Sequence, residues 1–336
     1  MMNAVTRTGR ETVLGDVREQ VRMMAVDYSD RYVPVKDVSF ESLSNVRVGS
    51  EMFYLREQAQ RLIASRLKIP YDYLARCETE IQAGNINHWF EKEKNTELFF
   101  RFDGGDVRAV FTPRYQPLDN VEVIDRLTDL YPENTKVICN LDGDIMYLGI
   151  VSEGTRVIRG DTMKRGISVI NSEIGLHRLA FMIFIFRLIC TNGLTIAQGI
   201  GGMAYKHISR KILDMFNDVI GNVDSSGDIA ETYIARAMDI PVQNPINLLE
   251  DYNRKYNLSS REIGAVEWAW LNDPEYRRNP IEGDVLMFPS STMYDIINTY
   301  TYAGHAPDIN ANESFRLEKT GGDILVAAAK NGKAWH

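Results

Sequence analysis

The sequence predicts an α+β fold in which a central antiparallel β-sheet of hairpins is flanked by N-terminal and C-terminal helices. Two strand–turn–strand patterns, at residues 98–111 and 136–151, each surround a glycine-containing turn. A very apolar run, Leu179 to Cys190, follows them and has the composition of a strand buried on both faces. Apolar residues at helical spacing dominate before and after this region. The order of helices, hairpins and helices is typical of the α+β class.

The first half of the chain supplies the first helices and both hairpins. Apolar residues at helical spacing predict a helix over 52–67, which Ile69-Pro70 ends because the residue before proline avoids the helical conformation. A shorter helix is expected over 71–83. Between the hairpins, residues 121–131 predict a helix with Asp119 or Asn120 as its cap. The second hairpin turns at Asp142-Gly143, a dipeptide favoured in tight turns.

The second half begins with strands and ends with helices. Residues 166–170 and 178–190 predict two strands, although a buried helix stays open for the second because apolar runs of this length are ambiguous. Helical spacing then recurs over 204–220, 229–238, 245–256, 259–271 and 290–302. We therefore expect four regions: a mostly helical region 1–94, the sheet core 95–200, a helical region 201–307 packed on the sheet, and a polar tail 308–336.

Composition and motifs exclude several classes of protein. The chain has 336 residues, of which 44% are hydrophobic and 25% charged, as in ordinary globular proteins. Its longest apolar run, Leu179 to Phe186, is far shorter than the roughly 20 residues of a membrane helix, and no apolar leader follows the N-terminus. The three cysteines form no C-x-x-C pair, and neither H-x-x-x-H nor G-x-S-x-G occurs. We expect a cytoplasmic protein without membrane attachment, catalytic site, metal or cofactor.

Charge is distributed unevenly along the chain. The net charge is −8, yet residues 151–220 hold nine Lys/Arg against five Asp/Glu. The flanking segments 1–150 and 221–336 have net charges of −5 and −7. A basic centre between acidic flanks is the pattern of local phosphate binding in an acidic protein, and chance clustering on a solvated face is the alternative.

Basic residues with interspersed aromatic residues predict a surface for single-stranded DNA. Lysine and arginine neutralise phosphates there, and each base stacked on an aromatic ring adds roughly 1–3 kcal/mol. Core packing is the competing interpretation of the aromatic residues. The predicted contact residues are Arg101, Arg108, Arg114, Tyr115, Tyr147, Arg156, Arg159, Lys164, Arg165, Arg178, Lys206, Arg210 and Lys211.

Four motifs resemble a known family. They are VFTPRYQPLDN at 110–120, VINSEIG at 169–175, RLICTNGL at 187–194, and NTYTY at 298–302 followed by His305. In this order, over residues 95–325, they resemble the phage- and plasmid-encoded domain of unknown function called phage/plasmid-like protein. A weaker resemblance is to the single-stranded-DNA-binding cofactor of a phage RNA polymerase. It implies a phage-encoded, non-virion protein of the host cytoplasm that binds single-stranded DNA cooperatively, associates with itself on DNA and recruits the polymerase to melted promoters.

Two other functions remain open at this point. Single-strand annealing recombinases of phages also place a curved antiparallel sheet over helices, so a recombination role is an alternative. The second alternative is a host-takeover factor that binds protein without nucleic acid. It would use the acidic, aromatic C-terminal half, where Glu267-Trp268-Ala269-Trp270 is joined by Tyr294, Tyr300 and Tyr302.

Overall fold

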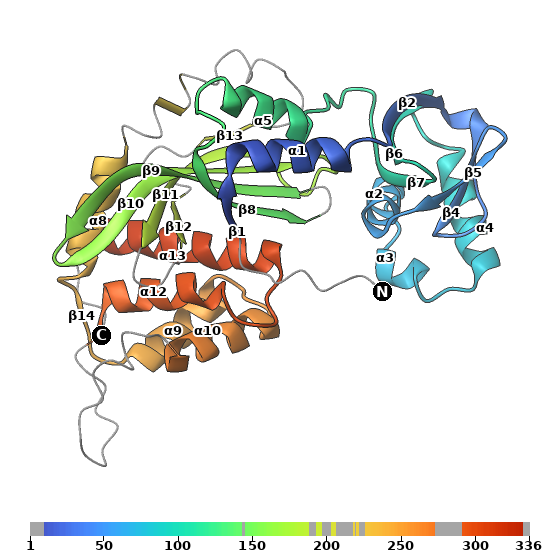
Figure 1. Cartoon of the computed structure of the whole chain (residues 1–336). Helices are drawn as coiled ribbons and strands as arrows, with labels where there is room; N and C mark the ends of the chain where they lie inside the picture. The colour runs from blue at the N-terminus through green and yellow to red at the C-terminus, as the bar shows by residue number, and fades with distance from the viewer. Residues whose placement is uncertain are drawn as a thin grey trace.

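The protein contains two principal β-sheets, each with its own helices and hydrophobic core, and is α+β as predicted (Figure 1). The structure is a computed structural model. It describes residues 10–142, 145–187, 193–196, 203–205, 218, 220–221, 226–272 and 291–331.

The small sheet has the strand order β2-β6-β7-β5-β4-β3. Its pairs are antiparallel except for the parallel pair β5–β7. Three helices, α2 to α4, pack on it and close a core rich in phenylalanine and valine. The elements are β2 (Tyr28–Pro34), the 3-10 turn η1 (Val35–Asp37), β3 (Val38–Phe40), β4 (Asn45–Val48), β5 (Glu51–Leu55), α2 (Glu57–Leu67), α3 (Tyr71–Leu74), α4 (Thr79–Phe90), β6 (Glu97–Asp103) and β7 (Asp106–Phe111).

The large sheet is antiparallel and has the order β1-β8-β9-β10-β11-β12, with β13 also paired to β11. All nine side chains of β11 are buried, which confirms the predicted strand and excludes the helical alternative over its length. The strands are β1 (Arg10–Val13), β8 (Lys136–Asp142), β9 (Ile145–Ile158), β10 (Asp161–Ser172), β11 (Leu179–Arg187), β12 (Gly193–Ile196) and β13 (Met203–Tyr205).

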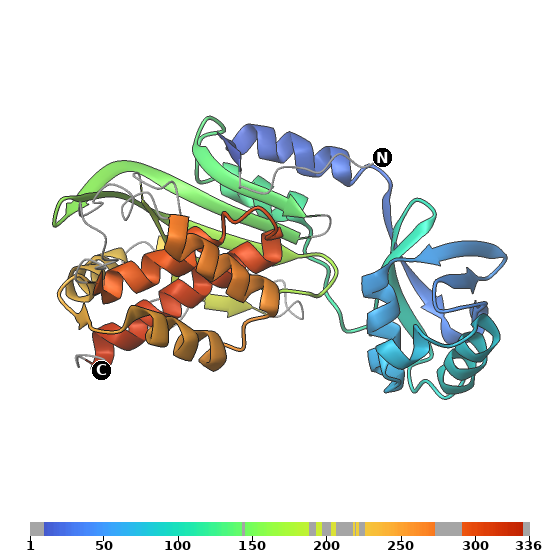
Figure 2. The same cartoon turned by 90° about the horizontal axis from the view of Figure 1, so that it is seen from below.

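Helices cover both faces of the large sheet. In Figures 1 and 2, α1 and α5 lie over one face of the sheet and α13 lies against the other. α12 packs on α13, and α9 and α10 lie outside these two helices. The helices are α1 (Leu14–Met24), α5 (Asn120–Thr128), α8 (Gly227–Ala237), α9 (Pro245–Lys255), α10 (Ser260–Asn272), α12 (Met293–Ala303) and α13 (Ala311–Asn331), and β14 (Pro241–Val242) pairs with β15 (Ser291–Thr292).

The predicted division of the chain is wrong for the first two regions, 1–94 and 95–200. The hairpin β6–β7 pairs with β2 and β5 of the small sheet, so the predicted sheet core 95–200 contributes to two separate sheets. The region 1–94 is not mostly helical, because five strands precede α2 and the predicted helix 52–67 is β5 followed by α2. Neighbouring hairpins have the same local pattern whether they join one sheet or two, because long-range pairing decides between these arrangements.

The C-terminal segment is likewise not a polar tail. Residues 311–331 form α13, which packs on α12 and β12 and buries Leu317, Ile324 and Leu325. Its polar residues include Lys319 and Asp323, which form an ion pair one helical turn apart. These polar residues surround an apolar stripe that the prediction overlooked. Ala204, where a helix was predicted to begin, lies in β13. Most of the predicted range 204–220 lies outside the described residues.

Gly166 is expected to be indispensable for the curvature of the large sheet. It follows a β-bulge between β10 and β9, and a Cβ at this position would lie 1.9 Å from the carbonyl oxygen of Ile150. Gly166→Ala should therefore lower the free energy of unfolding by about 1–3 kcal/mol, measured by urea unfolding. Gly154→Ala in β9, where a Cβ meets nothing within 4 Å, is the matched control. Equal stability of the two variants would contradict this account of the bulge.

Candidate functional site

The basic residues of the long β9–β10 hairpin are paired with acidic residues. Arg165 contacts Asp228 at 2.6 Å and Glu231 at 2.7 Å, both on α8. Arg156 lies 3.7 Å from Glu231, and Arg159 forms an ion pair with Asp239. These three predicted DNA contacts therefore attach α8 and its following turn to the hairpin, and their charges are largely neutralised within the protein.

Arg101 is a structural residue as well. Its side chain is 1% exposed, and it bonds to Asp30 at 3.0 Å and to Asp119 at 2.5 Å. A further nitrogen donates to the backbone oxygen of Glu173, 2.9 Å away. Arg101 thus joins the small sheet to the segment before α5 and to the β10–β11 turn, so the prediction that it neutralises DNA phosphates is wrong.

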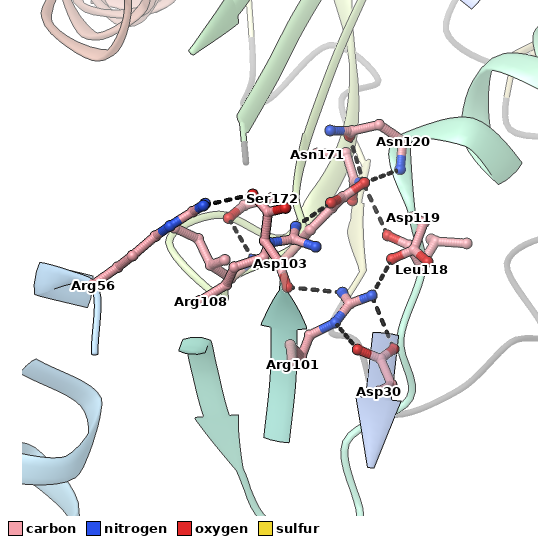
Figure 3. Close-up of polar contacts among 12 residues, drawn as sticks. Asp30, Arg56, Arg101, Asp103, Arg108, Leu118, Asp119, Asn120, Asn171 and Ser172 are labelled. Atoms are coloured by element: carbon pink, nitrogen blue, oxygen red, sulfur yellow. Dashed lines mark hydrogen bonds and ion pairs between the residues drawn. The ribbon is translucent and has the colours of Figure 1, made fainter. Parts of the chain in front are cut away.

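Glu173 is the centre of a buried polar cluster between the two sheets. Figure 3 shows its neighbours Arg101, Arg108 and Asn120. Its carboxylate forms an ion pair with Arg108, whose side chain is 0% exposed, and accepts the backbone N–H of Asn120 at 2.7 Å. That N–H belongs to the first turn of α5, where the helix dipole favours a negative charge. Burial and the nearby carboxylate of Asp119 raise the pKa of Glu173, and Arg108 opposes them. We call Arg101, Arg108, Asn120, Asn171 and Glu173, with Asp30 and Asp119, the Glu173 cluster.

Two of the sequence motifs meet in this cluster. Asn171 donates to the backbone oxygen of Leu118 and to the side-chain oxygen of Asn120, both at 3.0 Å (Figure 3). The segments 110–120 and 169–175 are therefore bound to each other. Arg101 and Arg108 both contact Glu173, so the prediction that Arg108 binds DNA is wrong as well. The polar residues of the two motifs were the available signal for this cluster.

Arg187 of the third motif lies close to α12, the helix that carries the fourth motif. Arg187 bonds to Asp161 at 2.5 Å, and the hydroxyl of Tyr294 on α12 donates to the same carboxylate at 2.6 Å. Burial strongly raises the pKa of Tyr294, so this hydroxyl stays protonated. Asn298, the first residue of the fourth motif, is buried one turn further along α12. The motif residues thus serve mainly to hold sheet and helices together.

The two predicted stacking tyrosines are both buried. Tyr115 stacks on Phe111 with ring centroids 3.8 Å apart, and its hydroxyl donates to the backbone of Glu173 at 3.3 Å. The hydroxyl of Tyr147 lies 3.0 Å from Asn312 and 3.2 Å from His177. Neither ring is exposed on the outer surface, so the alternative that these tyrosines pack in the core is correct. Tyr147, however, also lines a cavity.

This cavity lies between the large sheet and the first half of α13. It measures about 340 Å³, and we call it the α13 cavity. Phe184, Phe186 and Phe315 supply apolar wall, while His305 and Glu318 supply titratable groups. Burial raises the pKa of Glu318 to about 8 and lowers the pKa of His305.

A second, larger cavity adjoins the first. It measures about 720 Å³, runs over β8, β9 and β10, and shares Glu11, Ile138 and Phe186 with the α13 cavity. Lys136 and Lys164 line it, and neither forms an ion pair within the described part of the chain. We call it the lysine groove; it adjoins the α13 cavity at the three shared residues.

The remaining predicted contacts divide into exposed and undescribed residues. Arg114 and Arg178 are exposed and form no ion pair with any described residue. Arg114 precedes Tyr115, and Arg178 follows the turn that carries Glu173, so both flank the Glu173 cluster. Lys206, Arg210 and Lys211 lie outside the described residues. Of the thirteen predictions, Lys164, Arg114 and Arg178 are therefore the described cations that remain available to an anion.

The aromatic residues of the C-terminal half belong mostly to the core. Trp270, Tyr294 and Tyr300 are buried, and the partly buried Trp268 stacks on Tyr302 with ring centroids 5.2 Å apart. They form no exposed aromatic surface for a protein partner.

The comparisons with known proteins do not supply an identity. No family model, curated protein or solved structure matches the chain. Among the described residues, no three His, Cys, Asp or Glu side chains are grouped as metal ligands, and no helix is long and apolar enough to cross a membrane.

Proposed function

We propose that this protein binds single-stranded DNA in the lysine groove and acts without catalysing a reaction. The observation that carries the proposal is that the lysine groove adjoins the aromatic α13 cavity, with which it shares three lining residues. Lys136 and Lys164 provide cations in the groove, and aromatic rings line the α13 cavity. Lysines that contact phosphates beside aromatic surfaces for bases are typical of sequence-independent single-strand binding.

The charge of the groove sets the character of this binding. Glu11 and Glu153 line it together with the two lysines, so its walls carry two charges of each sign. Phosphate binding by so few cations is weak per strand and sensitive to salt. Such an interaction gains from neighbouring copies on the same strand, in keeping with cooperative binding and self-association on DNA.

The wider biological role rests on the family resemblance. We propose a phage-encoded, non-virion protein of the host cytoplasm that coats melted DNA and recruits a phage RNA polymerase. An annealing assay on complementary oligonucleotides distinguishes this role from recombination, because only an annealing protein accelerates strand pairing.

The groove lysines provide the test of DNA binding. The double variant Lys136→Gln, Lys164→Gln should weaken binding of an oligothymidylate at low salt and make log affinity less dependent on log salt, by about 1.4 in slope. Fluorescence anisotropy over a salt series measures both quantities. The matched control is Lys36→Gln, Lys330→Gln, which removes two exposed lysines outside the groove. Absence of any binding by the wild type at low salt, or equal effects of the two double variants, would overturn the proposal.

A further inference from the structure

The α13 cavity lies between one face of α13 and the large sheet. One face of α13 borders it through Ala311, Ser314, Phe315 and Glu318, which recur at helical spacing. The opposite wall is the large sheet, where β11 contributes Phe184 and Phe186 with ring centroids 6.3 Å apart. Figure 2 shows α13 lying along the sheet. A volume of about 340 Å³ falls at the lower end of the range for small-ligand pockets, roughly 300–1,000 Å³.

The titratable groups of this cavity select against anions. Glu318 accepts a long hydrogen bond of 3.4 Å from Thr195, and no cation of the described chain pairs with it. Glu11 adds a second carboxyl group. Because burial lowers the pKa of His305, its ring is neutral near pH 7 and supplies no compensating charge. The cavity therefore offers no positive charge to a phosphate. A neutral ligand with N–H or O–H donors could instead supply hydrogen bonds to the oxygens of Glu318.

The geometry of the Glu318 carboxylate limits which ligands can bind to it. Above pH 8 the Glu318 side chain is ionised. An ionised carboxylate accepts two parallel hydrogen bonds, so its best neutral partner carries two adjacent N–H donors. Among the four DNA bases, guanine alone presents adjacent ring and amino donors, N1–H and N2–H, on one edge. Thymine presents a single N–H between two carbonyl oxygens, which a carboxylate repels. Aromatic rings on the cavity wall match the flat faces of a base.

We propose that the α13 cavity takes up one guanine base of the bound strand, whose N1–H and N2–H donate to Glu318. This inference rests on the proposed function, because the lysine groove delivers the strand to the cavity that shares Phe186 with it. The backbone then binds without regard to sequence, while a single position of the strand prefers guanine. Ser314 and the neutral ring of His305 also line the cavity and provide donors for the remaining acceptors of the base.

Two oligonucleotides and two variants test the inference. A twelve-residue oligothymidylate is compared with the same strand carrying one central guanine, by fluorescence anisotropy on the full-length protein at pH 8.5, where Glu318 is ionised. The wild type should bind the guanine strand about 10- to 100-fold more tightly, as expected for one bidentate base contact. Glu318→Gln should remove this preference, because the amide places a donor against a guanine donor. Asp323→Asn, a carboxylate-to-amide change on α13 outside the cavity, should retain it.

The outcomes separate the inference from the proposed function. Equal affinity of the wild type for both strands would overturn the guanine site and leave single-strand binding intact. If neither strand binds, the proposed function fails, and a guanosine titration followed by NMR decides the inference: guanosine binding abolished by Glu318→Gln supports the site, and no binding overturns it. A preference for guanine that survives in Glu318→Gln would also overturn the assignment to Glu318.

Discussion

Replacement of Glu173 with alanine is expected to lower the free energy of unfolding by about 3–5 kcal/mol. The change leaves the guanidinium of Arg108 buried without its carboxylate and removes the acceptor of the Asn120 N–H at the start of α5. Removal of one partner of a buried ion pair is among the most costly defects that a single substitution creates. Because the Glu173 cluster joins the two sheets, the loss should affect their common unfolding transition in urea.

Two further variants make this result specific. Glu173→Gln keeps oxygen and shape but loses the negative charge, so its stability should lie between those of the wild type and Glu173→Ala. Glu51→Ala breaks an exposed Glu–Arg pair, with Arg31 at 3.1 Å, and should change stability by less than about 1 kcal/mol. Equal losses in Glu51→Ala and Glu173→Ala would show that the buried cluster has no special role in holding the sheets together.

The stability of the protein should fall as pH rises from about 4.5 to 8, because of Glu318. In the unfolded chain this carboxyl group ionises near pH 4.5, whereas burial raises its pKa to about 8 in the folded chain. Below pH 4.5 the Glu318 carboxyl group is protonated in both the folded and the unfolded state, so it does not change the free energy of unfolding with pH. Between the two values the folded state retains a proton that the unfolded state has lost, so stability declines, and above pH 8 the deficit is constant.

The Glu318→Gln variant isolates this effect. The amide cannot ionise, so at pH 8.5 the variant should be more stable than the wild type, on the order of 3 kcal/mol after allowance for solvent screening. At pH 5 the two proteins should differ little. Urea unfolding midpoints over pH 5–8.5 measure the difference, and other titrating groups, including His305, contribute equally to both proteins. A difference independent of pH would contradict the raised pKa.

Local elements were predictable where local chemistry determines them. The hairpins at 98–111 and 136–151 and the buried strand β11 follow from turn residues and apolar runs that lie within a few positions of each other. The helices α8, α9 and α10 also lie close to their predicted ranges. In each case, neighbours in the sequence supply most of the information.

The candidate site could not be predicted in the same way. Arg101 was predicted as a phosphate ligand, but Asp30, 71 positions earlier, neutralises it, and Arg165 is neutralised by Glu231, 66 positions later. A charge count along the chain cannot detect pairs at such separations. Lys164 alone among the predicted contacts lines the lysine groove, where it is joined by Lys136, which our sequence analysis did not select.

The sequence by itself determined the α+β class, the hairpins and the buried character of β11, because turn chemistry and hydrophobic periodicity act over a few residues. Only the tertiary structure decided that the hairpins belong to two sheets, that Glu173 holds these sheets together, and that α13 closes a cavity around Glu318. These features depend on contacts between segments distant in the chain. Burial there changes the charge and pKa of a side chain in ways that its sequence neighbours do not reveal.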